Sequence, residues 1–364
     1  MATSGTLNID GIPTPVAYTD GVNKNGRTLQ GFSTTADIRM KPGDDEDLDY
    51  FPFFEPYIKY YGTHDFADQI ATAGFEGTNA NLAKGDIKLA GYGFEARAEI
   101  AKKATAYLNA GIYSIREVYD AIHDCQEECL ASTSCNDDAV HALDEAVAFY
   151  VGSEFVTDSE GLGNMFFGLA EKRAQNFATA EDGTAGESMV NKALFLEYND
   201  MKAKLNTGKC AETEAIAEEI VRLMQIPLIQ GTLRYAYMLA TETAPSEEKM
   251  AEGAIFAAGI LPNVNECNED AATTIYENMR LKQSKTADTD FAQVKNAFES
   301  VYGCLRVSCA DIGGLVDPAT GNTYYQGAAP CGGVNNLGSG AGAMTYSMVA
   351  MTLGAVGAVA ALFM

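Results

Sequence analysis

The sequence predicts a mainly α-helical protein: a multi-helix bundle, either single or made of two related bundles, with irregular segments at both ends and disulfide cross-links. From about residue 95 the chain is rich in alanine, and its apolar residues recur with the period of about 3.6 residues that helices show. Residues 1–56 carry Gly, Pro, Thr and Asp without that period. Hydrophobic residues make up 47% of 364 residues, which allows a sizeable core and excludes global disorder.

The irregular N-terminal segment, residues 1–56, is expected to form extended stretches and turns. It contains an acidic run at residues 44–47 and a proline-punctuated run at residues 51–56. The acidic run lacks the pattern of an EF-hand loop, so a solvated loop is expected there.

Helices are expected to follow in a long series. The first is the longest and contains Gly111, and Asn136 begins the capping sequence of the second. Pro227 is expected to separate two helices, because proline lacks the backbone N–H that a helix interior needs. The expected helices span residues 95–124, 137–152, 163–177, 188–205, 213–225, 228–243, 246–260, 270–279 and 290–305, and residues 311–333 are again rich in turn formers.

A weak internal repeat is the reason to consider two related bundles. Chance similarity between alanine-rich helices explains it at least as well. The recurring residues, at a constant spacing along the chain, are Ala106, Ala110, Gly111 and Ile112, followed by Ala254, Ala258, Gly259 and Ile260.

The charge balance excludes nucleic acid as a partner. Lys and Arg number 25 against 50 Asp and Glu, for a net charge of −25, and such a surface repels phosphate backbones. It suits an extracellular face or a surface that attracts cations. No P-loop, G-x-G-x-x-G, G-x-S-x-G or H-E-x-x-H motif occurs, so no enzymatic activity is predicted.

The eight cysteines form an even set that fits four disulfides in an oxidising compartment. Their clustering favours bridging, since Cys125, Cys129 and Cys135 crowd one loop and Cys304 and Cys309 flank another. The alternative is a set of buried free thiols in a cytosolic protein. The connectivity stays open at this point.

The two ends of the chain give conflicting indications of localisation. The N-terminus has neither the basic region nor the apolar region of a signal peptide. Residues 344–364 are almost wholly apolar, and residues 334–343 form a spacer of small residues. This is the pattern of a GPI-attachment signal, with a transmembrane tail anchor or a tail packed on the fold as alternatives. A GPI signal requires secretion, so we expect a processed or incomplete N-terminus and a location on the extracellular face or in the periplasm.

A first candidate metal site lies between Tyr57 and Asp65. Tyr60, Tyr61, His64 and Asp65 place two phenols, an imidazole and a carboxylate within six positions. Hard trivalent cations prefer anionic oxygen ligands, and imidazole can complete their shell. The alternative is an aromatic cluster packed under a loop, with Asp65 capping the following helix.

A second candidate site comes from two D-x-x-H sequences that flank a helical hairpin. Asp120 and His123 end one helix, and Asp138 and His141 begin the next, with Asp144 continuing the second face. If the helices pack antiparallel, these side chains lie at similar heights and can converge on a metal. The alternative is a pair of exposed polar helix ends.

Two further patterns concern zinc and anions. A zinc site of His123, Cys125, Cys129 and Cys135 is conceivable, but its spacing fits no common zinc motif. Arg173 and Arg234 lie in otherwise apolar helices, and a buried arginine needs an anionic partner. That partner is either a carboxylate or a bound anion.

Several long blocks resemble the low-iron-inducible periplasmic proteins of algae, also called phytotransferrins. The similarity covers about residues 57–333, here taken as one helical iron-binding domain. The blocks appear in the expected order and lie at residues 101–125, 144–153, 169–177, 226–237, 251–258, 311–316 and 330–331.

The resemblance implies a non-enzymatic surface or periplasmic protein that concentrates Fe³⁺ under iron starvation. It also implies carbonate as a synergistic anion, and delivery by endocytosis as in diatom members. No ligand set is carried over, so the candidate residues above rest on residue chemistry. A GPI-anchored structural or adhesive protein without metal chemistry is the main alternative, and a metallopeptidase-like helical protein is a third. The membrane is an expected partner through the C-terminal tail.

Overall fold

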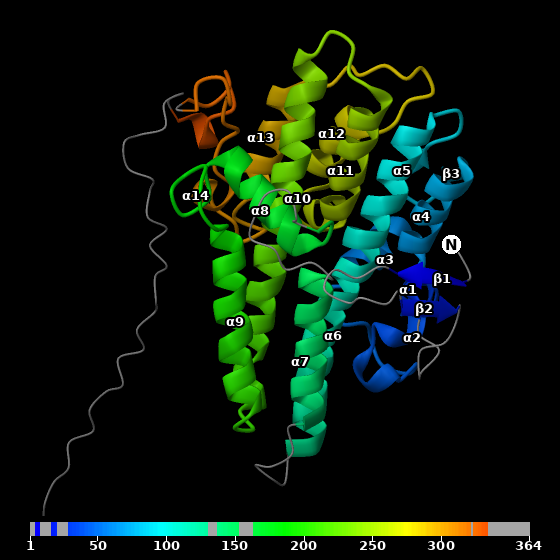
Figure 1. Cartoon of the computed structure of the whole chain (residues 1–364), viewed down its shortest axis with the longest axis vertical. Coiled ribbons are helices and arrows are strands. Elements are labelled where there is room, and N and C mark those ends of the chain that lie inside the picture. Colours follow the sequence, from blue (N-terminus) through cyan, green and yellow to red (C-terminus); the bar gives the residue numbers. More distant parts are fainter. Residues whose placement is uncertain are drawn as a thin grey trace, which may run out of the picture.

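The computed structural model describes residues 28–129, 137–152, 163–321 and 323–333, together with the backbone of two short strands. These strands, β1 (Ser4–Leu7) and β2 (Val16–Thr19), pair antiparallel, as do β3 (Asn79–Ala80) and β4 (Ile87–Lys88). Almost all the remaining regular structure is helical, which confirms the predicted fold class (Figure 1).

The described helices form antiparallel pairs. In Figure 1 the pairs α6–α7 and α9–α10 extend downward, while α11 and α12 lie beside α5 and α4 in the upper half. The helices, with short 3₁₀ and π segments marked η, are α1 (Leu29–Thr34), α2 (Ala36–Arg39), η1 (Pro42–Asp44), α3 (Glu55–Tyr61), α4 (Phe66–Glu76), α5 (Phe94–Lys103), η2 (Ala104–Ala110), α6 (Gly111–Cys129), α7 (Asp137–Val151), α8 (Phe166–Phe177), α9 (Met189–Leu205), η3 (Cys210–Glu212), α10 (Glu214–Thr241), α11 (Glu247–Cys267), α12 (Glu269–Met279), α13 (Phe291–Val301), α14 (Cys309–Ile312) and η4 (Pro330–Gly332).

The long first helix of the sequence prediction exists, but it is not uniform. The segments α5, η2 and α6 run on without a break, and η2 is a π-helical stretch of seven residues. Each residue of a π-helix bonds five positions along the chain, which widens the helix and changes the direction of its side chains. The Ala-rich pattern predicted the helix, and it gave no sign of this local rearrangement.

Several predicted helix boundaries are wrong. The helix expected to end at residue 260 continues as α11 to Cys267. The expected break at Pro227 does not occur, because α10 continues through that residue to Thr241. Pro227 is buried, and apolar packing along the whole helix outweighs the lost backbone hydrogen bond. Helices also begin earlier than residue 95. The segment predicted to be irregular contains α1 and α2, and α3, with Pro56 in its first turn, and α4 follow.

The described helices share one continuous hydrophobic core rather than dividing into two bundles. The two halves of the weak internal repeat, around Gly111 and Gly259, both contribute to it. Side-chain caps define several helix starts: Ser188, Ser246 and Asn268 each accept a backbone N–H from the first turn. Residues 334–364, predicted to form the spacer and the anchor, lie outside the described residues.

Three disulfides cross-link the described part of the chain. They join Cys125 to Cys210, Cys267 to Cys304 and Cys309 to Cys331. The disulfides fit the predicted oxidising compartment. The zinc hypothesis is wrong, because the sulfur of Cys125 is bonded to another sulfur and cannot act as a thiolate ligand. Over the described ranges, no helix is both long enough and apolar enough to cross a membrane.

Candidate functional site

A cluster of ionisable side chains is buried where α5 and η2 meet α8, α10 and α11. It contains both acidic and basic groups and two phenols, in a region whose other side chains are mostly apolar. Its members are Glu99, Lys103, Tyr107, Arg173, Arg234, Tyr235 and Glu252.

The spacing of the sequence places three of these groups along one side of the helix that runs from α5 into η2. Glu99, Lys103 and Tyr107 follow one another at four-residue intervals, so each lies about one turn beyond the last. Tyr107 is the middle residue of the π-helical stretch. π-Helical turns are rare and occur often at functional sites.

Lys103 is held between two carboxylates. Its Nζ contacts Glu99 and lies 2.8 Å from Oε1 of Glu252, and the residue is only 7% exposed. Burial tends to raise the pKa of Glu99, but hydrogen bonds from Lys102 and Lys103 outweigh it and lower the pKa. The charge of Lys103 is therefore neutralised locally.

Arg173 differs from Lys103 because its charge is not neutralised in this way. The residue is 8% exposed, and its buried Nε and Nη1 groups have no hydrogen-bond partner. Its guanidinium carbon lies 5.9 Å from the centre of the Phe256 ring. Burial, followed by the nearby charge of Arg234, lowers the pKa of Arg173 to about 10. A buried guanidinium with unsatisfied donors beside a second guanidinium is an arrangement that an oxyanion would complete.

Two tyrosines adjoin this arginine. Tyr107 and Tyr235 both stack on Phe256, with ring centres 5.6 and 5.7 Å from it. Burial raises the pKa of both phenols, and a hydrogen bond to Glu252 contributes for Tyr235, whereas Arg173 lowers both pKa values. Both hydroxyls are therefore protonated at neutral pH, and both interact electrostatically with Arg173 and Glu252.

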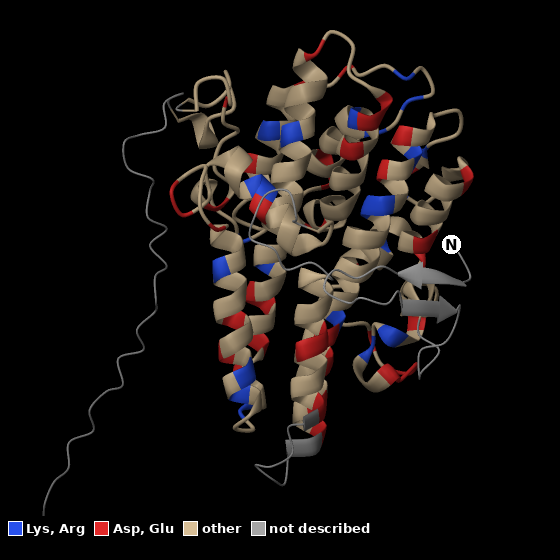
Figure 2. Ribbon diagram, viewed as in Figure 1, with Lys and Arg blue, Asp and Glu red and all other residues tan. Residues whose placement is uncertain are grey.

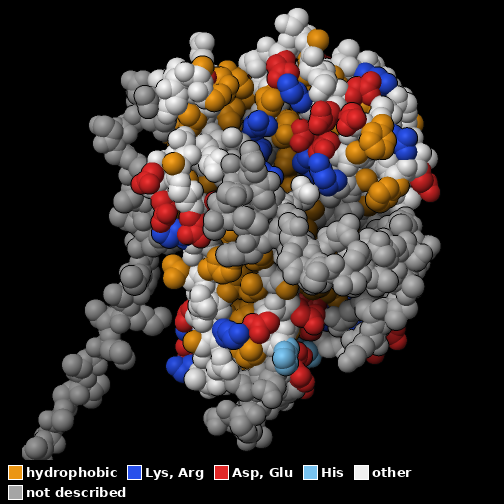
Figure 3. Space-filling model, in the orientation of Figure 1, with side chains coloured by type: hydrophobic (Ala, Val, Ile, Leu, Met, Phe, Trp, Pro, Cys, Tyr) orange, Lys and Arg blue, Asp and Glu red, His pale blue; other side chains and the backbone are white. Residues whose placement is uncertain are grey.

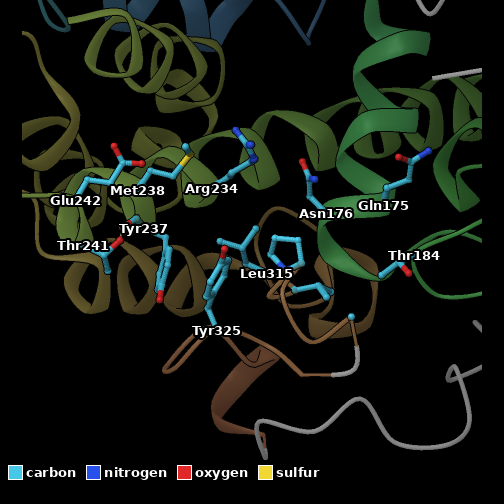
Figure 4. A pocket seen from close by; sticks show the side chains of 13 residues that line it. Gln175, Asn176, Thr184, Arg234, Tyr237, Met238, Thr241, Glu242, Leu315 and Tyr325 are labelled. Atoms are coloured by element: carbon cyan, nitrogen blue, oxygen red, sulfur yellow. Dashed lines mark hydrogen bonds between the residues drawn. The ribbon is translucent and has the colours of Figure 1, made fainter. Parts of the chain in front are cut away.

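Arg234 connects the buried cluster to an open cleft. Its guanidinium carbon lies 5.2 Å from the ring centre of Tyr235, and the residue also lines a cleft of about 540 Å³ between α8, α10 and the segment after α14. Figure 4 shows Arg234 between Met238 and Asn176, with the rings of Tyr237 and Tyr325 side by side nearby. The cleft gives a small solute access to Arg234.

Comparison with known protein families gives one match. The model of a family described as "Low iron-inducible periplasmic protein" (Fea1) matches residues 77–324. The chain belongs to this family. Its members are described as periplasmic, and the family is associated with iron uptake rather than catalysis. Searches of curated proteins and of solved structures each gave no match.

All members of the buried cluster lie inside the part of this Fea1 protein that matches the family. The first sequence-predicted site, Tyr60, Tyr61, His64 and Asp65, lies before it. Tyr60 and Tyr61 are brought together with their rings edge to face, 5.0 Å apart. The hydroxyl of Tyr61 donates to the carbonyl oxygen of Ala258 (2.6 Å), so it already has a partner.

The carboxylate of the first predicted site is also engaged. Asp65 accepts hydrogen bonds from Gln69 (2.8 Å) and from Thr63, and these bonds lower its pKa against the opposing effect of burial. His64 lies close enough to contribute to the same lowering. The four residues are thus neighbours, and their role as iron ligands stays a prediction.

The first half of the second predicted site lies in a network around Arg116. This buried arginine contacts Asp120 (2.7 Å) and Glu117 (2.9 Å) on α6, and Asp44 (3.2 Å) on η1. Burial by itself would lower the pKa of Arg116, but the surrounding carboxylates raise it. Burial raises the pKa of Asp120 overall, against the opposing charges of Arg116 and His123, so His123 lies beside the same network.

The second half of that site, on α7, faces solvent and α9 rather than the Arg116 network. His141 and Asp144 are exposed on α7, and Asp144 pairs with Lys202 on α9 (2.8 Å). Ser114 donates to the carbonyl of Ala146, which fixes the height of α6 against α7 and sets His123 and His141 about one turn apart. The structure therefore does not bring Asp144 to Asp120, and a metal role for these four residues stays a prediction.

Within the described ranges, no group of three or more His, Cys, Asp and Glu side chains is arranged to hold a metal ion. Sequence reasoning selected both arginines of the buried cluster but missed Tyr107, Lys103 and Glu252. The available signal was the four-residue spacing of Glu99, Lys103 and Tyr107, which places two charged groups and a phenol on one side of the helix.

Proposed function

We propose that this protein binds Fe³⁺ for iron acquisition in the periplasm or at the cell surface, with carbonate as a synergistic anion, as phytotransferrins do. Membership of the low iron-inducible family supports a role in iron acquisition. The observation that carries the anion is the buried guanidinium of Arg173, whose Nε and Nη1 have no partner.

Carbonate fits these arginines in shape and charge. It is planar and presents two oxygens in parallel, which matches the fork of donors on a guanidinium. Arg173 and Arg234 together offer two positive charges next to two phenols. A bound dianion would satisfy the donors of Arg173 and also remove the repulsion between the two arginines.

The charge of the whole molecule supports capture of a cation. The net charge is −25, and Figure 2 shows Asp and Glu on helices throughout the molecule. On the face seen in Figure 3, acidic side chains are interspersed with apolar ones rather than confined to one patch. Such a field raises the local concentration of cations around the protein.

The alternative function is that of an anchored structural or adhesive protein without metal chemistry. A scaffold has no need of an arginine that is buried without its hydrogen bonds, because an apolar residue of similar size would cost less. Attachment to the membrane through residues 344–364 stays a prediction, since these residues are not described.

Iron titration of the full-length protein tests the proposal. Ferric citrate added in bicarbonate buffer should produce a visible charge-transfer band from phenolate to iron, and binding should weaken without bicarbonate. Arg173→Gln should lower the affinity about tenfold to a hundredfold and abolish the bicarbonate effect. Arg97→Gln is the matched control, since Arg97 bonds only to backbone oxygens in the described contacts. A wild-type protein that stays colourless and binds no iron would contradict the proposal.

A further inference from the structure

The surroundings of Arg173 contain a set of oxygen ligands that sequence reasoning did not find. The phenols of Tyr107 and Tyr235 stack on the same ring, and Glu252 bonds to the second of them. From this juxtaposition, and resting on the proposed function, we infer that Tyr107, Tyr235 and Glu252 hold the ferric ion beside the anion on Arg173.

A cation already occupies the acidic side of this cluster. The ammonium of Lys103 lies 2.8 Å from Oε1 of Glu252 and 5.6 Å from the centre of the Phe256 ring. It is buried and also contacts Glu99, a carboxylate that it shares with the half-exposed Lys102. An incoming metal ion can therefore take Glu252 from Lys103 without leaving the lysine unpaired.

The two phenols differ from the buried tyrosines Tyr57 and Tyr61 in what they face. Tyr57 and Tyr61 donate to carbonyl oxygens of α11, at Gly259 (3.0 Å) and Ala258 (2.6 Å), and serve to join helices. Tyr107 and Tyr235 instead lie within electrostatic reach of Arg173 and Glu252. A phenol between a cation and a carboxylate is suited to become an anionic ligand when a metal replaces its proton.

The backbone gives independent support. Tyr107 lies within the π-helical stretch of η2, which changes the direction of its side chain relative to a regular helix. Stability alone does not favour such a stretch in the interior of a long helix. Its position at Tyr107 fits a requirement to direct this phenol at the cluster.

The charges and protons of the proposed complex balance. Each phenol loses its proton to solvent, and bicarbonate loses one more when it binds as carbonate. The ferric ion then meets two phenolates, one carboxylate and one dianion, and the two guanidiniums neutralise the remaining charge. Lys103 stays paired with Glu99 beside it, and Lys102, which shares this carboxylate, is partly exposed to solvent.

Conservative variants of the full-length protein test this ligand set by the charge-transfer band. Tyr107→Phe and Tyr235→Phe remove only an oxygen and should each weaken ferric binding at least tenfold, with an altered band. The double variant should lose the band completely. Glu252→Gln should weaken binding while it leaves the phenolate band of any bound iron in place.

Two tyrosines outside the cluster provide comparison. Tyr302 is buried at the C-cap of α13, and Tyr302→Phe should bind iron as the wild type does. Tyr61→Phe tests the first sequence-predicted site, and under this proposal it should also bind iron as the wild type does. If the wild type gains the charge-transfer band and the Tyr107→Phe, Tyr235→Phe double variant keeps it, the proposed ligand set is refuted but iron binding is not. If the wild type gains no charge-transfer band, the proposed function itself is refuted. Circular dichroism of each variant confirms that it is folded.

Discussion

Arg173 is the residue whose situation is hardest to explain by stability alone. Its charged group is out of water, two of its donors are unsatisfied, and a second arginine lies close by. Each of these features costs free energy in the absence of an anion. A residue that destabilises the fold but completes a ligand site fits a binding function rather than a structural one.

Arg173→Met should therefore raise the free energy of unfolding, by about 1–3 kcal/mol in buffer without bicarbonate. The methionine fills similar space and leaves no donor unpaired. Urea unfolding of the variant and the wild type measures the difference. A loss of stability in the variant would indicate that Arg173 has protein partners and that no anion is missing.

The lowered pKa of the neighbouring Glu99 predicts that the free energy of unfolding depends on pH in the acid range. Its folded-state pKa lies below the ordinary value of 4.5 because Lys102 and Lys103 favour the carboxylate. The stabilising contribution is therefore present above about pH 4.5 and is lost as the pH falls through the folded-state pKa. Glu99→Gln should lower the unfolding midpoint at neutral pH and flatten the fall in stability below pH 4.5. Identical pH profiles for the two proteins would contradict this assignment.

At the scale of helices, the close approach of α10 to α11 positions Phe256, the ring on which the tyrosines of the buried cluster stack. Gly231 lies on α10 opposite Phe256, and a Cβ atom added there would lie 2.7 Å from Cδ1 of that ring. Phe256 in turn carries both tyrosine rings. The glycine is thus required for space, since its helical backbone does not demand unusual dihedral angles.

Gly231→Ala should lower the free energy of unfolding by about 1–3 kcal/mol, even though alanine is the better helix former. It should also shift Phe256 and so weaken ferric binding. Urea unfolding and iron titration on the same preparation measure both effects. Gly303→Ala is the control, because a Cβ atom there meets nothing within 4 Å. A neutral or stabilising effect of Gly231→Ala would mean that the helices can separate at no cost.

At the scale of the whole molecule, disulfides join segments that are distant in sequence. Cys125 on α6 and Cys210 on η3 are 85 residues apart, and Cys309 and Cys331 are 22 apart. A cross-link stabilises mainly by restricting the unfolded chain, and the effect grows with the length of the closed loop.

Replacing both Cys125 and Cys210 with alanine should lower the free energy of unfolding by about 4–5 kcal/mol. The same change at Cys309 and Cys331 should cost about 3 kcal/mol, because the loop is shorter. Denaturant unfolding under non-reducing conditions measures both variants. The reverse order would show that native packing at the two bridges, rather than loop length, controls their contribution.

Much of the helical pattern could be read from the chain because it is local. The 3.6-residue period predicted the helices from residue 95 onward, apart from the break at Pro227 and the end of α11. Proline is disfavoured locally, and only the packing of α10 against its neighbours shows that the helix continues. The early helices α1, α2 and α3 were missed because each is at most seven residues long, which is too short for a 3.6-residue period to show.

The sequence by itself determined a helical, acidic protein of an oxidising compartment, and it pointed to Arg173 and Arg234 as cations in apolar helices. Period, composition and charge are properties of neighbouring residues, so they need no folded chain. Only the tertiary structure decided that Tyr107, Tyr235 and Glu252 lie near Arg173. Tyr107 and Tyr235 are more than a hundred residues apart in the sequence. A site of this kind depends on which faces of distant helices pack together, and no local pattern carries that information.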